Sequence, residues 1–440
     1  MPTLAQFLNR GGKRLREWVG LGGAEGKARV HAENWLELAD KVWALRRDVL
    51  PEREAAELRT RTEDLREKYR KRANPDQLTH SMDALEPVLK RNGGAIYPKT
   101  ALVENVEFFL VAAIVIIGVR SYFVQPFKIP TNSMWPSYSG MTPDVYHRPE
   151  DVPGVLSRAA RFVLFGARHQ EVTAPESGAI TVPVGIARLA DGGGKLLYGP
   201  VAAKSWLVLP ATNREYVIYV NATPVKVQVP QDFDFDWAFQ EAFGLTQAQL
   251  AAMAESTPKR QGNFGWVTLA RRAEAGKAFL SFDVITGDQL FVDRMSYHFV
   301  RPKVGQGFVF FTGKIPGIAS VMGEQYYIKR LVGTPGDTLE IKPPVLWRNG
   351  QPITGALAFA KNAQRADRFQ GYVFGPEGRA EHLLAPGDTL KVPKDSFFAM
   401  GDNSNNSFDG RYWGFVPGKE VVGRPLFIYF PFSKRWGLTP

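Results

Sequence analysis

The chain contains no cysteine. This absence excludes disulfide bonds, catalysis by a thiol and any zinc centre with cysteine ligands, and it leaves the redox compartment of the protein open. Histidine is also scarce, with six residues in 440, and no two of them have the i, i+4 spacing of a helical metal site. We therefore expect no metal centre and no cofactor.

The amino terminus lacks the apolar run of a secretory signal. It reads MPTLAQFLNRGGKRLREW, so we expect no cleaved signal peptide and a start that stays in the cytoplasm. The length and the hydrophobic content of 44% suffice for two or three domains. The net charge of +11 suits anionic lipid or nucleic acid, but charge alone restricts the partners little.

Residues 28–73 have the spacing of helices. VHAENWLELADKVWALRRDVL carries apolar residues three and four apart, and Pro51 opens a second, highly charged run, PEREAAELRTRTEDLREKYRKR. This pattern predicts a helical hairpin within a helical region over 1–103. A basic helix pair could contact RNA or a headgroup, but the interleaved acidic residues favour a solvated helical face. We assign it no chemistry.

The longest uninterrupted apolar run is FFLVAAIVIIGV, residues 108–119. Alone it is too short for a bilayer core of about 30 Å and could be a buried core helix. Extended from Val106 to Phe127 it reaches spanning length, if Glu107 and Arg120 extend to opposite interfaces. We predict a transmembrane helix with an interfacial segment over 104–127. Its flanking lysines and arginines differ little, with the N-terminus inside favoured.

The remainder of the chain reads as β-rich. Runs such as EYVIYVNATPVKVQV, GFVFF and PLFIYF carry β-branched and aromatic residues, several bounded by Gly, Pro, Asn or Asp. Two stretches within it, 155–166 and 237–256, have helical spacing. No repeat of fixed period is present, which argues against a solenoid or propeller.

A candidate nucleophile, Ser133, lies in IPTNSMWPS just after the apolar segment. Pro130 makes the preceding residue extended, but most serines beside prolines are loop residues, and a nucleophile needs a base. No histidine has a suitable setting. In QYYIKRLVG, Lys329 shares one strand face with Tyr327 and Leu331, which could desolvate its amine and lower its pKa. The alternative is an exposed lysine on an edge strand.

A third candidate region is AMGDNSNNSFDGRYWGFVP, between apolar segments. It could be an Asx-rich loop whose side chains bond to their own backbone. It could also be a polar clasp that orients an active-site group, with Arg411 paired to a nearby acid.

Taken in order, the span, FKIPTNSMWPS, GDQLFVDRMSYHF, YYIKRLVGTPGD and MGDNSNNSFDGRYWGFVP resemble the type I signal peptidase family. The resemblance implies a Ser/Lys dyad, with Ser133 as nucleophile and Lys329 as general base. It implies an oxyanion hole that uses Thr131 and a lysine-orienting role for Ser407. The other matched positions are structural braces at Arg330, Asp402, Asp409 and Arg411, and shallow substrate pockets at Tyr327 and Ile328.

The chain departs from the family pattern in two places. Thr131-Asn132-Ser133 stands where the family usually has Ser-Gly-Ser; threonine keeps the hydroxyl, and asparagine is the non-glycine residue that best tolerates positive φ. The second departure is a block that separates the serine box from the next strand. We expect an inserted α+β domain of unknown role at 139–286, and a mainly β, signal-peptidase-like catalytic domain built from 128–138 and 287–440.

The resemblance implies a membrane-bound signal peptidase I that cleaves signal peptides from secreted preproteins. It would be a single-pass protein of the cytoplasmic (inner) membrane, with an extracytoplasmic catalytic domain. Its partners would be preprotein signal peptides, which could pair as added strands with Lys128–Pro130 and Gln325–Tyr327, and the lipid bilayer, with no nucleic acid. The preprotein repertoire and the oligomeric state do not follow from the sequence.

Two alternatives stay open. One is a catalytically silent, membrane-anchored binding module in which the insertion carries the function. The other is a self-cleaving Ser/Lys repressor, which the apolar span and the absence of an obvious DNA-reading helix pair disfavour.

Overall fold

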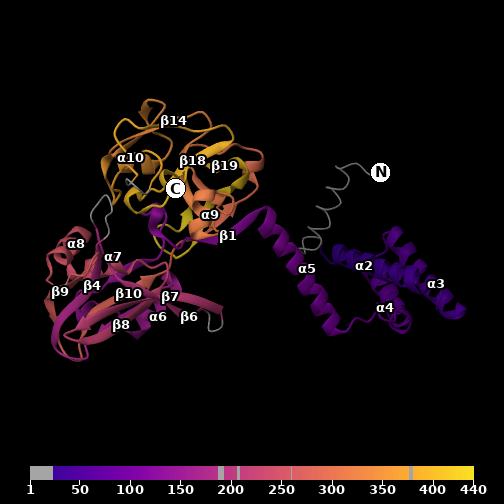
Figure 1. Cartoon of the computed structure of the whole chain (residues 1–440). Coiled ribbons are helices and arrows are strands. Elements are labelled where there is room, and N and C mark those ends of the chain that lie inside the picture. Colours follow the sequence, from indigo (N-terminus) through magenta and orange to yellow (C-terminus); the bar gives the residue numbers. More distant parts are fainter. Residues whose placement is uncertain (1–22, 187–192, 206–208, 259, 376–379) are drawn as a thin grey trace. The chain divides into compact units, whose positions relative to one another are not determined.

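The computed structural model describes residues 23–186, 193–205, 209–258, 260–375 and 380–440 (Figure 1). The chain divides into two compact units, Met1–Ile116 and Ile117–Pro440. Each unit is described here by itself.

The first unit is a bundle of three helices, seen at the indigo end of Figure 1: α2 (Gly23–Arg46), α3 (Glu52–Arg70) and α4 (Pro75–Asn92). The hairpin predicted over 28–73 corresponds to α2 and α3, and α4 follows it as a third helix. Helix α4 begins at Asn74, whose side chain accepts a hydrogen bond from Gln77 N–H at 2.9 Å. The third helix completes a core that two amphipathic helices would leave open on one side, and it supplies Leu78, Met82, Leu85, Val88 and Leu89 to that core.

Helix α5 (Ala101–Tyr122) covers the apolar run and carries no buried residue. Within the described ranges it is the one helix that is long and apolar enough to cross a membrane. A helix that is hydrophobic all round does not suit a water-exposed surface.

The second unit is built on an eight-stranded antiparallel sheet. Its strand order is β1-β11-β20-β12-β13-β18-β19, with β21 paired to β20. The bounds of these strands are β1 (Val124–Lys128), β11 (Gln289–Asp293), β12 (Gly307–Phe311), β13 (Tyr326–Gly333), β18 (Ser396–Met400), β19 (Val416–Pro417), β20 (Val421–Phe430) and β21 (Gly437–Leu438). Because β1 and β13 come from distant parts of the chain, the sheet brings the serine box and the lysine strand into one fold.

A smaller antiparallel sheet, in the order β16-β15-β14-β17, lies between β13 and β18 in the sequence. Its strands are β14 (Thr338–Lys342), β15 (Val345–Arg348), β16 (Gln351–Pro352) and β17 (Thr389–Lys391). The helices of this part of the unit are α9 (Pro316–Met322), α10 (Leu357–Gln364), α11 (Gly410–Trp413) and the 3₁₀ turns η3 (Ser296–His298), η4 (Ser404–Asn406) and η5 (Gly418–Glu420).

The stretch between the serine box and β11 folds as strands and helices around its own core (Figure 1). One sheet has the order β2-β10-β3, and a six-stranded one has β5-β4-β7-β6 with β8 on β7 and β9 on β4. The bounds are β2 (Thr142–Val145), η2 (Pro149–Asp151), α6 (Val155–Phe165), β3 (Arg168–Thr173), β4 (Gly178–Ile186), β5 (Gly194–Leu196), β6 (Tyr198–Ser205), β7 (Leu209–Val220), β8 (Thr223–Pro230), α7 (Phe235–Phe243), α8 (Gln247–Ser256), β9 (Phe264–Ala273) and β10 (Ala278–Ile285).

The single helix expected over 237–256 is two helices. Gly244 ends α7 in the left-handed conformation with φ 65°, and Thr246 starts α8 with a capping box. The apolar residues on both sides of Gly244 follow one helical spacing. A prediction from periodicity alone therefore gave one helix where the structure has two.

Asp288 holds the two ends of this stretch together. Its carboxylate accepts the Ser139 N–H at 2.7 Å, and its own N–H donates to Ser139 O at 2.8 Å. Arg435 binds both oxygens of the fully buried carboxylate, at 3.0 Å each. Beside it, Gly287 lies so close to Ile129 that a Cβ would fall 1.9 Å from the Ile129 carbonyl oxygen. The long stretch therefore leaves and rejoins the main sheet at one point and does not separate β1 from β11.

Replacing Asp288 with alanine should destabilise the second unit. It removes the partner of Arg435 and leaves the buried Ser139 N–H without an acceptor, a loss of about 2–4 kcal/mol in the free energy of unfolding. Denaturant unfolding of the detergent-solubilised chain measures it. Asp232→Ala, at an exposed aspartate, is the control and should change stability by less than about 0.5 kcal/mol. Equal effects of the two variants would refute the role given to Asp288.

Candidate active site

Ser133 lies in a short 3₁₀ turn, η1 (Asn132–Met134), which follows β1 after the segment 129–131. The Asn132 side chain closes the loop that follows: its Nδ2 donates to Met141 O at 2.8 Å, and its Oδ1 accepts the Gly140 N–H at 2.9 Å. Asn132 does not have positive φ, so its tolerance of that conformation is not what suits it to this position. Its amide holds the turn in place by hydrogen bonds that a glycine cannot make.

Lys329 lies on β13 with its amine against Ser133. The Nζ–Oγ distance is 2.5 Å, and the two side chains are hydrogen-bonded. Lys329 is 4% exposed, and its Nζ lies 5.6 Å from the centre of the Tyr327 ring. Burial lowers the pKa of Lys329 from 10.5 to about 8, although Asp409 nearby opposes this change. The alternative of an exposed edge-strand lysine does not describe this side chain.

Asn403 ties the glycine-aspartate-asparagine run to the serine turn. Its backbone N–H donates to Ser133 O at 3.1 Å, and its side-chain amide donates to Asn132 O at 3.0 Å. Sequence reasoning did not assign Asn403 a role. An asparagine in a polar loop can bind a neighbouring segment through both its backbone and its side-chain amide, and this signal could have pointed to Asn403. Nothing in the sequence indicated which segment it would bind.

Arg330 and Asp402 form a buried ion pair behind Lys329. Arg330 donates through Nε at 3.1 Å and through a terminal nitrogen at 2.5 Å, and it also reaches Ser137 Oγ and Gly305 O. Burial disfavours the charge of Arg330, but Asp402 outweighs it and raises the arginine pKa above its usual value. The pair thus links the lysine strand to the polar run and to the segment after the serine turn.

A second buried pair joins Arg411 and Asp409. The guanidinium donates to both carboxylate oxygens at 2.9 Å, and Gly401 N–H donates to the same carboxylate at 3.0 Å. Burial would raise the pKa of Asp409, but Arg411 holds it below the usual value. The polar run is therefore neither a free loop nor bonded only to itself, since Asp402 bonds to Arg330 of β13 and Arg411 donates to Val373 O at 2.8 Å.

Four further predicted site residues lie around this centre. Thr131 is exposed and extended, and its hydroxyl does not cap η1. Tyr327 and Ile328 are half-buried on β13. Ser407 is 5% exposed, and its Oγ has no hydrogen-bond partner among the described residues. A hydrogen bond from Ser407 to Lys329 is thus not seen, although Ser407 reaches the same wall, where a Cβ on Gly401 would lie 2.2 Å from its Oγ.

Two strand edges beside Ser133 are open. β1 is the last strand of the sheet, and β18 pairs with β13 only from Arg330 onward. Thr312 N–H donates to Gln325 O at 2.9 Å. In an antiparallel pair, hydrogen-bonded and non-hydrogen-bonded residue pairs alternate, so the N–H and C=O of the next residue, Tyr326, point away from β12. The two strands approach each other where the rings of Phe127 and Tyr326 meet at 5.1 Å. An extended chain could add to either edge here.

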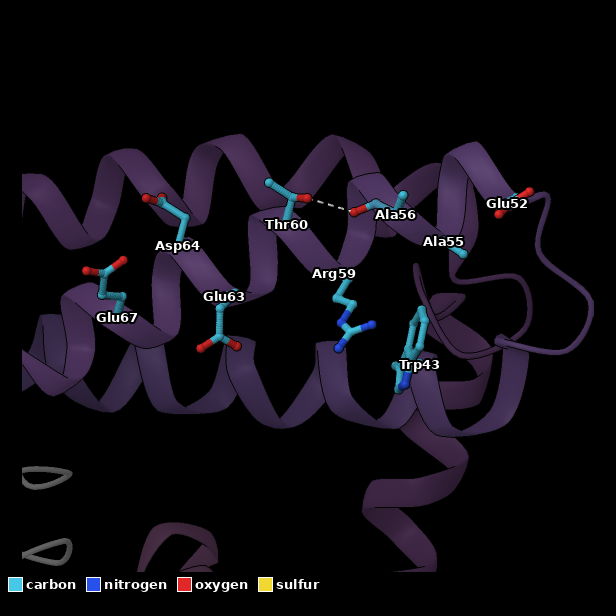
Figure 2. A pocket seen from close by; sticks show the side chains of 9 residues that line it. All are labelled: Trp43, Glu52, Ala55, Ala56, Arg59, Thr60, Glu63, Asp64 and Glu67. Carbon is cyan, nitrogen blue, oxygen red and sulfur yellow. Dashed lines mark hydrogen bonds between the residues drawn. The ribbon is translucent and has the colours of Figure 1, made fainter.

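A groove on the first unit is lined by residues that form no catalytic group. Figure 2 shows an open groove of about 720 Å³ on the first unit, between Trp43 and the side chains of α3, with Arg59, Glu63 and Glu67 along it. It contains no nucleophile with an adjacent base. Across the described ranges, no three histidine, aspartate or glutamate side chains are grouped to hold a metal ion.

Comparison with known proteins gives a consistent set of relatives. A family described as "Signal peptidase, peptidase S26" matches residues 280–430. Signal peptidase I T of Bacillus subtilis is 31% identical over 149 residues, which cover 34% of this chain and 67% of that protein. The probable signal peptidase I-1 of Synechocystis sp. is 34% identical over 155 residues, 34% of this chain and 66% of the relative. The matched part thus spans about two thirds of the length of such relatives.

A solved structure of a signal peptidase I from Enterococcus faecalis V583 is also similar in sequence. It is 26% identical and matches 28% of this chain and 97% of its own, with a TM-score of 0.22. At this TM-score it does not bear on the fold.

The buried amine of Lys329 should lower the stability of the fold. Below pH 8 the amine is charged in the folded and unfolded states, and the pKa of about 8 against 10.5 corresponds to about 3 kcal/mol of destabilisation. As pH rises from about 8 to 10.5 the folded state loses its proton first, and the penalty declines. Lys329→Met should therefore raise the free energy of unfolding at pH 7, and by less at pH 10.

Denaturant titrations at the two pH values measure this difference. Lys342→Met, at an exposed lysine of β14, is the matched control and should change the free energy of unfolding at pH 7 by less than about 1 kcal/mol. The claim that burial penalises the charged amine would be contradicted if Lys329→Met did not raise the free energy of unfolding. It would also be contradicted if the rise were equal at both pH values.

Proposed function

We propose that this chain, which belongs to the type I signal peptidase family, is a membrane-anchored serine endopeptidase that removes signal peptides from preproteins. The observation that carries the proposal is the contact of Ser133 Oγ with a buried lysine amine at 2.5 Å. A serine hydroxyl needs an adjacent base to attack a carbonyl, and a desolvated lysine supplies one near neutral pH.

In the proposed reaction, neutral Lys329 accepts the hydroxyl proton as Ser133 Oγ attacks the scissile carbonyl. The ammonium then donates that proton to the leaving amine. The same amine next takes a proton from the water that attacks the ester, and it returns that proton to Ser133 Oγ as the bond between the acyl carbon and Oγ breaks. Arg330–Asp402 and Arg411–Asp409 hold the walls of the site, and Asn403 positions the turn. These are positioning roles, since none of the four charged groups bonds to Ser133 Oγ or Lys329 Nζ in the described structure.

The oxyanion of the tetrahedral intermediate would bind at the serine turn. Ser133 N–H donates to no backbone carbonyl among the described residues, and the Thr131 hydroxyl is exposed two residues earlier. Donors that are already placed and unpaired stabilise a developing negative charge without reorganisation.

The membrane assignments are part of the same proposal. Helix α5 would be the single anchor, and Ser133 follows it after only β1 and a short turn. We place residues 1–103 in the cytoplasm and the catalytic domain, 128–138 with 287–440, on the other side. A nucleophile close to the membrane surface suits a substrate whose cleavage site follows an apolar segment.

Preprotein cleavage by the detergent-solubilised chain tests the dyad. Ser133→Ala and Lys329→Met should each lower kcat by at least about 10³-fold, since removing a nucleophile or its base leaves only binding and the oxyanion hole. Lys342→Met should cleave like the parent. The parental rate should fall as pH drops through about 8, because Lys329 becomes protonated. Parental activity in either dyad variant would refute the Ser/Lys mechanism, and an absence of cleavage by the parent itself would favour the silent binding module.

The open edge of β13 gives a test of substrate binding. Tyr326→Pro removes a backbone N–H that faces the open edge, where proline fits an edge strand. It should lower kcat/KM about three- to tenfold, the value of one backbone hydrogen bond. Tyr326→Ala removes the ring but keeps the N–H and serves as the control. If both variants lose the same activity, the effect belongs to the ring and the added-strand model is refuted.

A further inference from the structure

Helix α6, within the stretch that separates the serine box from β11, is an apolar helix on the outside of the unit. It reads VLSRAARFVLF and contains no buried residue. Val155 and Leu156 are 82% and 87% exposed, and Phe162 and Val163 are 56% and 66% exposed. Apolar side chains gathered this closely on an exposed helix indicate a surface that is covered in the working protein.

The polar and apolar side chains of α6 are placed the opposite way from those of a helix on a water-exposed surface. Its two arginines point to the protein: Arg161 donates to Asp283 at 2.7 Å and to Asp144 at 2.6 Å, and Arg158 donates to Pro153 O at 2.7 Å. A water-exposed helix buries its apolar face and keeps its charges outside. In α6 the charge of Arg161 fixes the helix to the unit, and all the apolar residues except the half-buried Phe165 face away.

The apolar surface continues onto the end of β20. Phe432 N–H donates to Leu164 O at 3.0 Å, which joins the turn after β20 to the last turn of α6. Phe432 and Trp436 are 53% and 51% exposed, and their rings lie 6.4 Å apart. Tryptophan with one face exposed beside apolar side chains is typical of the membrane–water interface.

Two cations border this surface. Arg168 is the first residue of β3, which follows α6 after a short turn, and Lys434 lies between the two aromatic residues in the sequence. Both are exposed, and neither has an ion-pair partner among the described residues. The helix itself contains no acidic residue. Unpaired cations around an apolar helix complement anionic lipid headgroups.

We propose that α6, with Phe432 and Trp436, lies in the headgroup region of the bilayer as an interfacial helix, a lipid contact separate from α5. The exposed residues extend around most of the circumference, since only Arg158, Arg161 and Phe165, spaced along one side of the helix, are half-buried. A helix that docks in a protein groove presents a narrower stripe, whereas a bilayer covers every outward side chain. The contact does not depend on the proposed peptidase activity.

Because the chain has no cysteine, single-cysteine variants can carry one spin label each. Leu156→Cys and Phe162→Cys place it on α6, and Leu357→Cys, at a leucine of α10 that is 67% exposed, is the matched control. The full-length protein is placed in nanodiscs of phosphatidylethanolamine and phosphatidylglycerol, one chain per disc. Relaxation by oxygen and by a water-soluble nickel complex then reports the depth of each label. Thermal unfolding confirms that each variant is folded.

Labels at 156 and 162 should be reached by oxygen and shielded from nickel, while the label at 357 is reached by nickel. Equal access of nickel to all three labels would overturn the proposal. Shielding that appears only in vesicles at high protein density, and is lost at one chain per disc, would assign the surface to a second copy and also overturn it.

Discussion

The site depends on keeping one lysine amine away from water beside a serine hydroxyl. The pKa of about 8 for Lys329 results mainly from burial, and the nearby carboxylates oppose it. The fold must therefore keep Asp402 and Asp409 close enough to shape the wall and yet neutralise their charge. It does so with Arg330 and Arg411, each bonded to one carboxylate through two nitrogens. The arginines limit how far the carboxylates can stabilise a lysinium ion.

The sequence predicted the parts of the site that depend on local chemistry. Alternation in QYYIKRLVG correctly put Lys329 beside Tyr327 on one strand, and the polar run indicated acids with Arg411 close by. It could not predict hydrogen bonds between distant segments, such as those from Asn403 to the serine turn or from Ser139 to Asp288. The chain contains many donors and acceptors of the same kind, and the sequence does not indicate which of them pair. The roles of Thr131 and Ser407 remain predictions from the resemblance, and the hydrogen bond expected of Ser407 is not recorded.

Apolar spacing in 28–73 correctly predicted two helices, α2 and α3, while the third helix that completes their core, α4, lies beyond that range. The one error in helix assignment has a local cause, since the apolar pattern continues across Gly244 and joined α7 to α8. The long stretch after the serine box was read correctly as containing its own strands and helices. What no pattern indicated was its attachment: Asp288, Gly287 and Arg435 close its two ends on the main sheet. Trp237 of α7 also meets Trp135, two residues after Ser133, at 5.3 Å between ring centres.

The ionisation of Lys329 is the most direct measure of this account. Protein labelled with ¹³C at the lysine ε-carbons, compared with Lys329→Met to identify the missing signal, can be titrated by NMR in detergent. The account predicts that the Lys329 signal titrates near pH 8, well below the ordinary lysine pKa of about 10.4. A Lys329 amine that titrates with the exposed lysines would contradict the claim that burial makes it a base.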